Sequence, residues 1–367
     1  MAKSFAQWGN DLYTGRRSYA VVPKIKIWLA VAVGVIVVCT LLLFRPGLEL
    51  GMEFVGGTEF RVATSSTAQG PALDAVQGVL GADLSPQVTS LGDGGVRVQV
   101  GKISNEQTEA VKSALAKAYE VATTEVSNQM VSASWGSDVS GKALRGSIIF
   151  LILVGLAMVL YFRNWAMAVS AITALIHDLV VTVGVYAAVG FEVTPATLIG
   201  FLTVLGYSMY DTVVVFDKVR ENTEGVLDQS QYTYGEAANL AVNQTMVRSI
   251  NTSVVALLPV AAILFIGWAA LGPSSLQDIS LALFVGMAAG TYSSIFLATP
   301  LEVTLRNRQP KIRQHTDKVL ARRVSALAAG DSTGVGVAAL AGIGALRAGE
   351  HLGQRAQPRR KPRDARR

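Results

Sequence analysis

The chain has few residues that form covalent links or bind metals. Its 367 residues include one cysteine, Cys39, and three histidines. A single cysteine excludes an intrachain disulfide, so any domain outside a membrane must be stabilised by its own apolar core. The sequence contains no GxxxxGK[ST] motif, no His/Cys spacing typical of a metal site and no GxSxG motif. We therefore expect no metal, no cofactor and no enzymatic activity.

Charged residues are also scarce. Asp, Glu, Lys and Arg make up 16% of the chain and hydrophobic residues 51%, whereas an average soluble domain is roughly 25% charged. A helix needs about 20 apolar residues to cross a membrane. The segments that meet this requirement are approximately 27–44, 146–162, 166–189, 196–217, 248–268 and 277–300. We therefore predict a polytopic α-helical membrane protein with six transmembrane helices.

Basic residues are distributed unevenly among the connecting segments. They lie before the first span and after the second, fourth and sixth, whereas acidic residues outnumber basic ones between spans one and two. The positive-inside rule places the basic segments in the cytoplasm. We therefore expect residues 1–26 and 304–367 on the cytoplasmic side, as well as a loop at 218–245 within the membrane region 142–303. Within this loop, residues 234–245 are expected to form an interfacial helix that leads into span five. Residues 45–141 would lie outside.

The outside segment 45–141 is predicted to be a small α+β domain. A capping-box spacing, Ser104 with Gln107, begins one helix, and the run Gly92-Asp93-Gly94-Gly95 is typical of a hairpin turn. The expected elements are strands at 59–64, 87–91, 96–100 and 124–133 and helices at 71–80 and 104–119. The order β-α-β-β-α-β is that of the ferredoxin-like split unit.

The C-terminal segment 304–367 is rich in alanine and glycine beyond Arg323 and then strongly basic. Such a composition favours disorder. The tail is either a solvated end attracted to anionic lipid or a contact for ribosome or RNA. Because the positive charge lies in tails and inner loops, we expect no specific binding of nucleic acid.

Asp211 lies within an apolar run of helix length, 198–216. A carboxylate at membrane depth costs at least about 2.5–3.5 kcal/mol, so its presence favours a function. Gly200, Thr203 and Tyr207 recur with it at helical spacing, and Ser208 lies one turn before it, where it could form a hydrogen bond with Asp211. This stripe is expected to face other helices, because lipid cannot satisfy its polar groups.

Arg248 is the predicted partner of Asp211. Both lie about five residues inside the cytoplasmic ends of their spans, or about 8 Å at 1.5 Å per residue, so the two side chains are at the same depth. Asn251, Thr252 and Val255 would share the face of Arg248. Alternatively, Arg248 extends to the inner lipid headgroups. If the pair forms, the charge of Asp211 depends on whether the two helices are together.

A second polar pair, His177-Asp178, lies in the middle of the third predicted span, with Thr173 and Thr182 one turn away on either side. A carboxylate next to an imidazole indicates a proton relay. Two polar groups that satisfy each other and fix helix packing explain the pair equally well, so both interpretations stay open.

Three short motifs resemble one known family. They are the runs Gly51-Met52-Glu53-Phe54-Val55-Gly56-Gly57-Thr58, Ser208 to Asn222, and Arg248 to Ser253. The double glycine of the first run permits a turn with positive φ and close backbone approach. Together they resemble the SecF family, the smaller polytopic auxiliary subunits of the bacterial Sec protein translocase, over about residues 20–310. The positions that match the family's motifs, besides Asp211 and Arg248, are Glu53, Phe54, Gly56, Gly57, Thr58, Asp217, Arg220, Asn251 and Thr252.

The resemblance implies an architecture, partners and a role. The fold would be half of a resistance–nodulation–division (RND) type transporter with a ferredoxin-like extracytoplasmic domain, in the bacterial cytoplasmic membrane. The implied partners are SecD, the SecY-SecE-SecG channel, YajC and YidC, and the translocating preprotein. In that family the residues matching Asp211 and Arg248 conduct protons, so the coupling ion would be the proton. Ser208, Asp178 and His177 are further candidates for conduction.

Two positions depart from the family pattern. Glu53 stands where aspartate is usual, and Tyr210 stands where asparagine is usual beside Asp211. Hydrogen bonding to Asp211 from that neighbour therefore cannot be inferred from the family.

Two other functions compete with protein export. An RND-type exporter of small molecules or lipids usually duplicates this unit and has larger external domains than the roughly 95 residues available here. An intramembrane aspartyl protease would use Asp211 and a second carboxylate in one site, but a Gly-x-Gly-Asp companion motif is missing.

Overall fold

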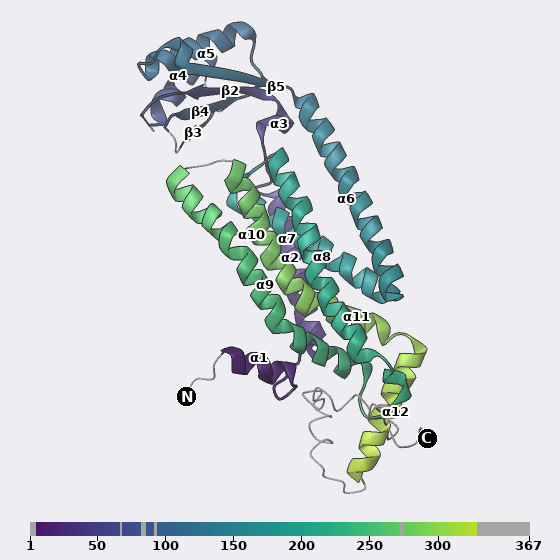
Figure 1. Cartoon of the computed structure of the whole chain (residues 1–367). Helices are drawn as coiled ribbons and strands as arrows, with labels where there is room; N and C mark the ends of the chain where they lie inside the picture. The colour runs from purple at the N-terminus through teal and green to yellow at the C-terminus, as the bar shows by residue number, and fades with distance from the viewer. Residues whose placement is uncertain (1–4, 67, 82–85, 92–93, 272–274, 329–367) are drawn as a thin grey trace, which may run out of the picture. The chain divides into compact units, whose positions relative to one another are not determined.

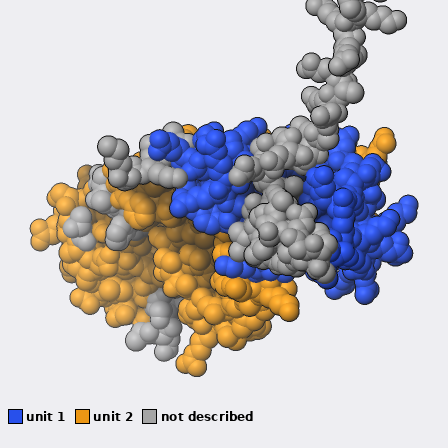
Figure 2. Space-filling model, turned by 90° about the horizontal axis from the view of Figure 1, so that it is seen from below, with its two compact units in different colours: residues 1–25, 214–248, 299–367 blue, residues 26–213, 249–298 orange. Residues whose placement is uncertain are grey.

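The computed structural model describes residues 5–66, 68–81, 86–91, 94–271 and 275–328 (Figure 1). The chain forms two compact units, which Figure 2 colours separately. The larger unit comprises residues 26–213 and 249–298. The smaller unit comprises residues 1–25, 214–248 and 299–367. Each unit is described in turn.

Six helices of the described chain are long and apolar enough to cross a membrane, which confirms the predicted number and order of spans. The apolar segments are Val22–Phe44, Asp138–Phe162, Trp165–Val189, Pro195–Asp228, Tyr234–Ile266 and Gln277–Arg306. The helices that carry them are α2 (Ile25–Phe44), α6 (Ala133–Phe162), α7 (Trp165–Val189), α8 (Pro195–Thr223), α9 (Tyr234–Leu271) and α10 (Ser275–Tyr292). A π-helical segment, Ser293–Ala298, and α11 (Thr299–Arg306) follow α10 directly.

The α+β domain has the predicted chain order. Its sheet has the strand order β3-β4-β2-β5, with every neighbouring pair antiparallel, and two helices complete the β-α-β-β-α-β unit (Figure 1). This is the ferredoxin-like arrangement. The elements are β2 (Gly57–Val62), α4 (Gly70–Leu80), β3 (Gln87–Ser90), β4 (Val96–Val100), α5 (Asn105–Ala118) and β5 (Val126–Val131).

One apolar core holds this domain together without disulfides. Phe60, Val98 and Leu115 are fully buried in it. The predicted capping box begins α5: the Gln107 amide donates to Ser104 Oγ at 3.2 Å, and the Ser104 amide donates to Gln107 Oε1 at 2.9 Å. The domain is smaller than expected, because α6 already begins at Ala133, whereas we predicted the domain to continue to 141. The polar first turns of α6 carry no apolar signal that would show the helix start.

The double glycine in the first motif has the conformation that the sequence predicted. Gly56 has a φ of +79°, which favours glycine. At Gly57 a Cβ atom would lie 2.4 Å from the Val100 carbonyl oxygen, so only glycine permits the β2–β4 contact. The preceding short helix α3 (Met52–Val55) places Phe54 against the apolar cluster of the membrane helices.

A short parallel strand pair ties the start of the α+β domain to the loop between the third and fourth spans. β1 (Glu49–Leu50) pairs with β6 (Glu192–Val193). Burial raises the pKa of the Glu192 carboxyl. Nearby carboxylates raise this pKa further, and Arg97 opposes them. The junction therefore concentrates negative charge beside the ends of two spans.

Small residues allow the membrane helices of the larger unit to pack closely. A Cβ atom on Gly184 of α7 would lie 2.3 Å from Cys39 Cβ of α2, and one on Gly286 of α10 would lie 2.4 Å from Val204 of α8. Such contacts are common between membrane helices, where close backbone approach replaces hydrophobic burial. Cys39 is accordingly a buried packing residue.

The smaller unit joins the N-terminal segment to the start of α9 through asparagine side chains. Asn239 Oδ1 accepts hydrogen bonds from the amides of Val21 and Val22, both at 3.0 Å, and Asn243 Oδ1 accepts one from the Tyr19 amide at 2.7 Å. The unit also contains α1 (Phe5–Tyr13) and α12 (Pro310–Ala328).

Two predicted segments of the smaller unit differ in part from the expectation. In the predicted loop 218–245, α8 continues to Thr223, which was not expected, whereas the expected helix at 234–245 is present as the start of α9, at Tyr234. Thr233 and Glu236 form a capping box at that start, with the Thr233 amide donating to Glu236 Oε2 at 2.8 Å and the Glu236 amide to Thr233 Oγ1 at 3.3 Å. The tail was expected to be disordered from residue 304, but α12 is helical. Its salt bridge from Arg323 to Glu236, at 2.7 Å, fixes it to α9. The remainder of the tail, 329–367, lies outside the described residues.

We predict that Leu115→Ala destabilises the α+β domain by about 2–5 kcal/mol, because it leaves a cavity in the only core of that domain. Hydrogen exchange of the full-length protein in detergent should show faster exchange of the β2 and β4 amides. Ser113→Ala, at an exposed position of the same helix, is the matched control. Equal exchange in both variants would contradict this account of the core.

We also predict that Glu192→Gln strengthens the β1–β6 junction at neutral pH. Folding raises the pKa of the Glu192 carboxyl, so this group loses its proton at a lower pH in the unfolded chain than in the folded one. The stability of the junction therefore falls as the pH rises above the ordinary pKa of a glutamate. Exchange of the Gly51 amide, which donates to the Val193 carbonyl at 2.9 Å, should slow at pH 7 and be unchanged near pH 4. The opposite pH dependence would refute the prediction.

Candidate functional site

Asp211 is buried in α8, with 6% of its surface exposed. Ser249 Oγ of α9 donates to Asp211 Oδ1 at 2.8 Å, and Ser294 Oγ of the π-helical segment donates to Oδ2. The expected protein-facing environment is therefore present, and two serine hydroxyls from two other helices satisfy the carboxylate.

Asp178 of α7 is fully buried and has the same kind of environment. Its Oδ2 accepts hydrogen bonds from Ser208 Oγ at 2.5 Å and from Ser293 Oγ at 2.8 Å. Its Oδ1 lies 3.0 Å from His177 Nδ1. The predicted histidine–aspartate contact exists, and it extends to serines of two further helices.

The two carboxylates are linked through neighbouring residues on two helices. Ser208 lies one helical turn before Asp211 on α8, but its hydroxyl binds Asp178 and not Asp211 as expected. Ser293 and Ser294, one bound to each carboxylate, are consecutive. We call these residues, together with Ser249, the serine–carboxylate cluster. It brings Asp178, Asp211 and the predicted Ser208 together within one compact unit.

The π-helical segment Ser293–Ala298 supplies the two serines that sequence reasoning missed. π-turns are rare and are found frequently at functional sites. Gly290, one turn earlier, permits the approach, because a Cβ there would lie 3.0 Å from Ser208 Cβ. In the sequence, Ser293-Ser294 is an ordinary small-residue pair in an apolar span, so the only available signal was its position in the last span.

His177 keeps one ring nitrogen without a hydrogen-bond partner among the described residues. Its ring is 3% exposed, and Nε2 is the unsatisfied atom. Tyr292 lies beside it, with 6.0 Å between ring centroids. Thr173 and Thr182 donate to the carbonyls of Val169 and Asp178 in their own helix.

The predicted polar stripe of α8 is only partly buried, since Gly200 and Asp211 are buried and Tyr207 is half-buried. Thr203 is exposed, and its hydroxyl donates to the Ile199 carbonyl of the same helix. Gly200 contacts α10, where a Cβ on it would lie 2.9 Å from Ala282. Tyr210 is 58% exposed. The departure from the family pattern at this neighbour therefore leaves the serine bonds of Asp211 intact.

Arg248 ends the segment 214–248 of the smaller unit, whereas Asp211 belongs to the larger unit. The contact between the two side chains therefore stays a prediction. The predicted face with Asn251, Thr252 and Val255 is the exposed face of α9. The buried face carries Ser249 and Ser253 instead. An apolar-looking helix gives no indication that its serines, rather than its larger polar residues, point inward.

The remaining motif residues have structural or surface positions. Thr58 is fully buried in β2, whereas Asp217 and Arg220 are exposed near the end of α8. Within the described ranges, no group of three His, Cys, Asp or Glu side chains is arranged to hold a metal ion.

Comparison with known proteins places these features in a family. Residues 110–308 match the family described as protein export membrane protein SecD/SecF, C-terminal. The chain is 44% identical to the protein translocase subunit SecF of Streptomyces coelicolor, covering 88% of this chain and 86% of that protein. It is 41% identical to the SecF subunit of Mycobacterium tuberculosis, covering 88% and 74%.

The fold has a solved counterpart. The crystal structure of SecDF, a translocon-associated membrane protein from Thermus thermophilus, matches with a TM-score of 0.67 and 27% identity, over 79% of this chain. The chain spans 39% of the length of that SecDF chain. The matched family model, the SecF relatives and this structural counterpart agree. The chain therefore belongs to the SecD/SecF family of protein-export membrane proteins and is of the SecF type.

Proposed function

We propose that the chain, as an auxiliary subunit of protein export, couples proton movement across the cytoplasmic membrane to preprotein translocation. The observation that carries this proposal is the serine–carboxylate cluster, in which two buried carboxylates bind consecutive serines of one helix. A group that only stabilised helix packing would not need two carboxylates, since neutral small residues provide packing at lower cost.

Serine suits proton transfer between the two carboxylates. A hydroxyl has one donor and two acceptor sites, so it accepts a proton on one side while it donates on the other. Asp178 and Asp211 each hold two such hydroxyls. A proton bound at one carboxylate would change the hydrogen bonds of the π-helical segment and thereby bias the position of the last span.

The proposed driving energy is sufficient for mechanical work. One elementary charge that crosses 100 mV supplies about 2.3 kcal/mol. The α+β domain is connected to the membrane helices directly, through α6 at its end and the β1–β6 pair at its start. Movement of the helices would therefore be transmitted to this domain, which in our proposal acts on the preprotein outside the membrane.

We further propose SecD as the direct partner, with the SecY-SecE-SecG channel, YajC and YidC as associated components. The relative from Thermus thermophilus is named SecDF, a single translocase subunit. Apolar side chains on α2 and α6 are extensively exposed, including Leu41, Leu153 and Leu160, and such surfaces suit lipid or a second membrane subunit. Both termini would face the cytoplasm.

The competing functions have less support. An aspartyl protease requires two carboxylates that share one site, whereas Asp178 and Asp211 each have their own pair of serines. An RND-type exporter is disfavoured by the small α+β domain and by the SecF relatives.

We predict that Asp211→Asn and Arg248→Met each abolish the part of export that depends on the proton gradient and leave assembly with SecD intact. Asparagine keeps the size of the side chain but cannot carry the charge. Preprotein release from proteoliposomes, with and without a pH gradient, measures the effect. Glu224→Gln, an exposed carboxylate just after α8, is the control, and gradient-dependent release at the wild-type rate in both variants would defeat the proposal.

We predict that Ser294→Ala slows gradient-dependent release by roughly tenfold, since loss of one donor to a buried carboxylate costs about 1–3 kcal/mol. Ser294→Thr, which retains the hydroxyl, should recover most of the rate. The matched control is Ser147→Ala, whose hydroxyl donates only to the Ala143 carbonyl of its own helix in the hydrogen bonds described. Equal rates for Ser294→Ala and Ser147→Ala would show that the π-helical serine has no part in coupling.

A further inference from the structure

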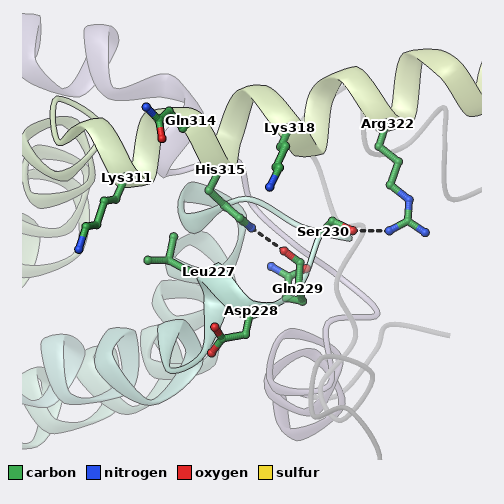
Figure 3. A pocket seen from close by; sticks show the side chains of 9 residues that line it. All are labelled: Leu227, Asp228, Gln229, Ser230, Lys311, Gln314, His315, Lys318 and Arg322. Atoms are coloured by element: carbon green, nitrogen blue, oxygen red, sulfur yellow. Dashed lines mark hydrogen bonds between the residues drawn. The ribbon is translucent and has the colours of Figure 1, made fainter.

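A cavity of about 700 Å³ lies in the smaller unit, between the loop after α8 and helix α12 (Figure 3). Its volume is in the range of small-molecule sites. No part of the proposed proton pathway uses it. Along the chain, the cavity follows the fourth and the sixth spans, whose apolar segments extend to Asp228 and Arg306.

The cavity has an excess of positive charge. Lys311, Lys318 and Arg322 line it from α12, and Asp228 lines it from the loop. The spacings of seven and four residues place the three basic side chains on one face of the helix, as Figure 3 shows. Three positive charges and one negative charge leave a formal excess of two, which favours an anion.

Hydrogen bonds hold the loop that forms one side of the cavity. The Gln229 side chain donates to the carbonyls of Val226 and Tyr232, both at 2.8 Å. Arg322 donates to Ser230 Oγ, which joins the loop to α12 (Figure 3). These bonds fix the conformation of the loop, which faces the basic side of α12 across the cavity.

His315 of α12 provides an unsatisfied polar group in the lining of the cavity. It is 6% exposed, and its Nε2 lies 2.8 Å from the Gln229 carbonyl oxygen. Since a carbonyl only accepts, Nε2 carries a proton. Nδ1 then has no hydrogen-bond partner among the described residues. This buried nitrogen is therefore available to a polar group of a ligand in the cavity.

We propose that this cavity binds a phosphate group, carried either by the headgroup of an anionic phospholipid or by the free ion. Lysine and arginine are the usual partners of phosphate, and basic pockets at the membrane boundary bind anionic headgroups. Bound lipid would hold α12 and the loop together beside the start of α9.

The test uses the full-length protein in phosphatidylcholine nanodiscs that contain 20% phosphatidylglycerol. Native mass spectrometry counts the lipids that the released protein retains. Wild-type protein should retain phosphatidylglycerol over phosphatidylcholine. In Lys318→Gln/Arg322→Gln this preference should fall by roughly tenfold to thirtyfold. Each basic side chain contributes about a fivefold preference, and the variant loses two of them. Arg313→Gln, at an exposed position of α12 outside the cavity lining, should keep it.

A second measurement separates a lipid headgroup from free phosphate. Isothermal titration of the detergent-solubilised protein with inorganic phosphate should show weak binding that is lost in the same double variant. If phosphate binds strongly and no lipid preference exists, the phosphate site stands and its ligand is the free ion. Lys318→Arg/Arg322→Lys, which retains both charges and verifies folding, should bind like wild type. Binding of neither probe, or an equal loss in Arg313→Gln, would overturn the proposal.

Discussion

The structure of the membrane region depends on the hydrogen bonds that satisfy two buried carboxylates. Asp178 and Asp211 lie on different helices, and each requires donors that lipid cannot provide. Consecutive serines of the π-helical segment Ser293–Ala298 meet both requirements. Three spans, α7, α8 and the last, are therefore fixed relative to one another by polar bonds, while the glycine contacts at Gly200, Gly286 and Gly290 bring α8 and α10 close enough for those bonds to form.

The same constraint explains how a local proton event can have a distant effect. In the proposed function, a proton bound at either carboxylate would remove the charge that its serines stabilise and would thereby change the preferred position of the last span. α6 and the β1–β6 pair connect the membrane helices to the α+β domain, whose own apolar core lets it move as a unit. In the proposed function, this connection converts proton movement into work on a preprotein.

Elements with strong local signals were predictable from the sequence. The spans follow from apolar length, the ferredoxin-like order from alternation and turn residues, and the start of α5 from its capping box. The conformations of Gly56 and Gly57 followed from the double glycine. The inward-facing serines could not be predicted, because small hydroxyl residues are compatible with either face of a membrane helix and their role depends on partners distant in the chain. The helix α12 was not predicted, because the ion pair of Arg323 with Glu236 that fixes it joins residues distant in the chain.

Infrared difference spectroscopy of the reconstituted protein tests the central claim most directly. Carboxyl C=O bands report the protonation of Asp178 and Asp211 after a pH step, with Asp178→Asn and Asp211→Asn assigning each band. Our account predicts that both bands change in wild type, and that replacing Ser293 and Ser294 by alanine makes the two changes independent. Bands that do not respond to pH, or that remain linked without the serines, would contradict it.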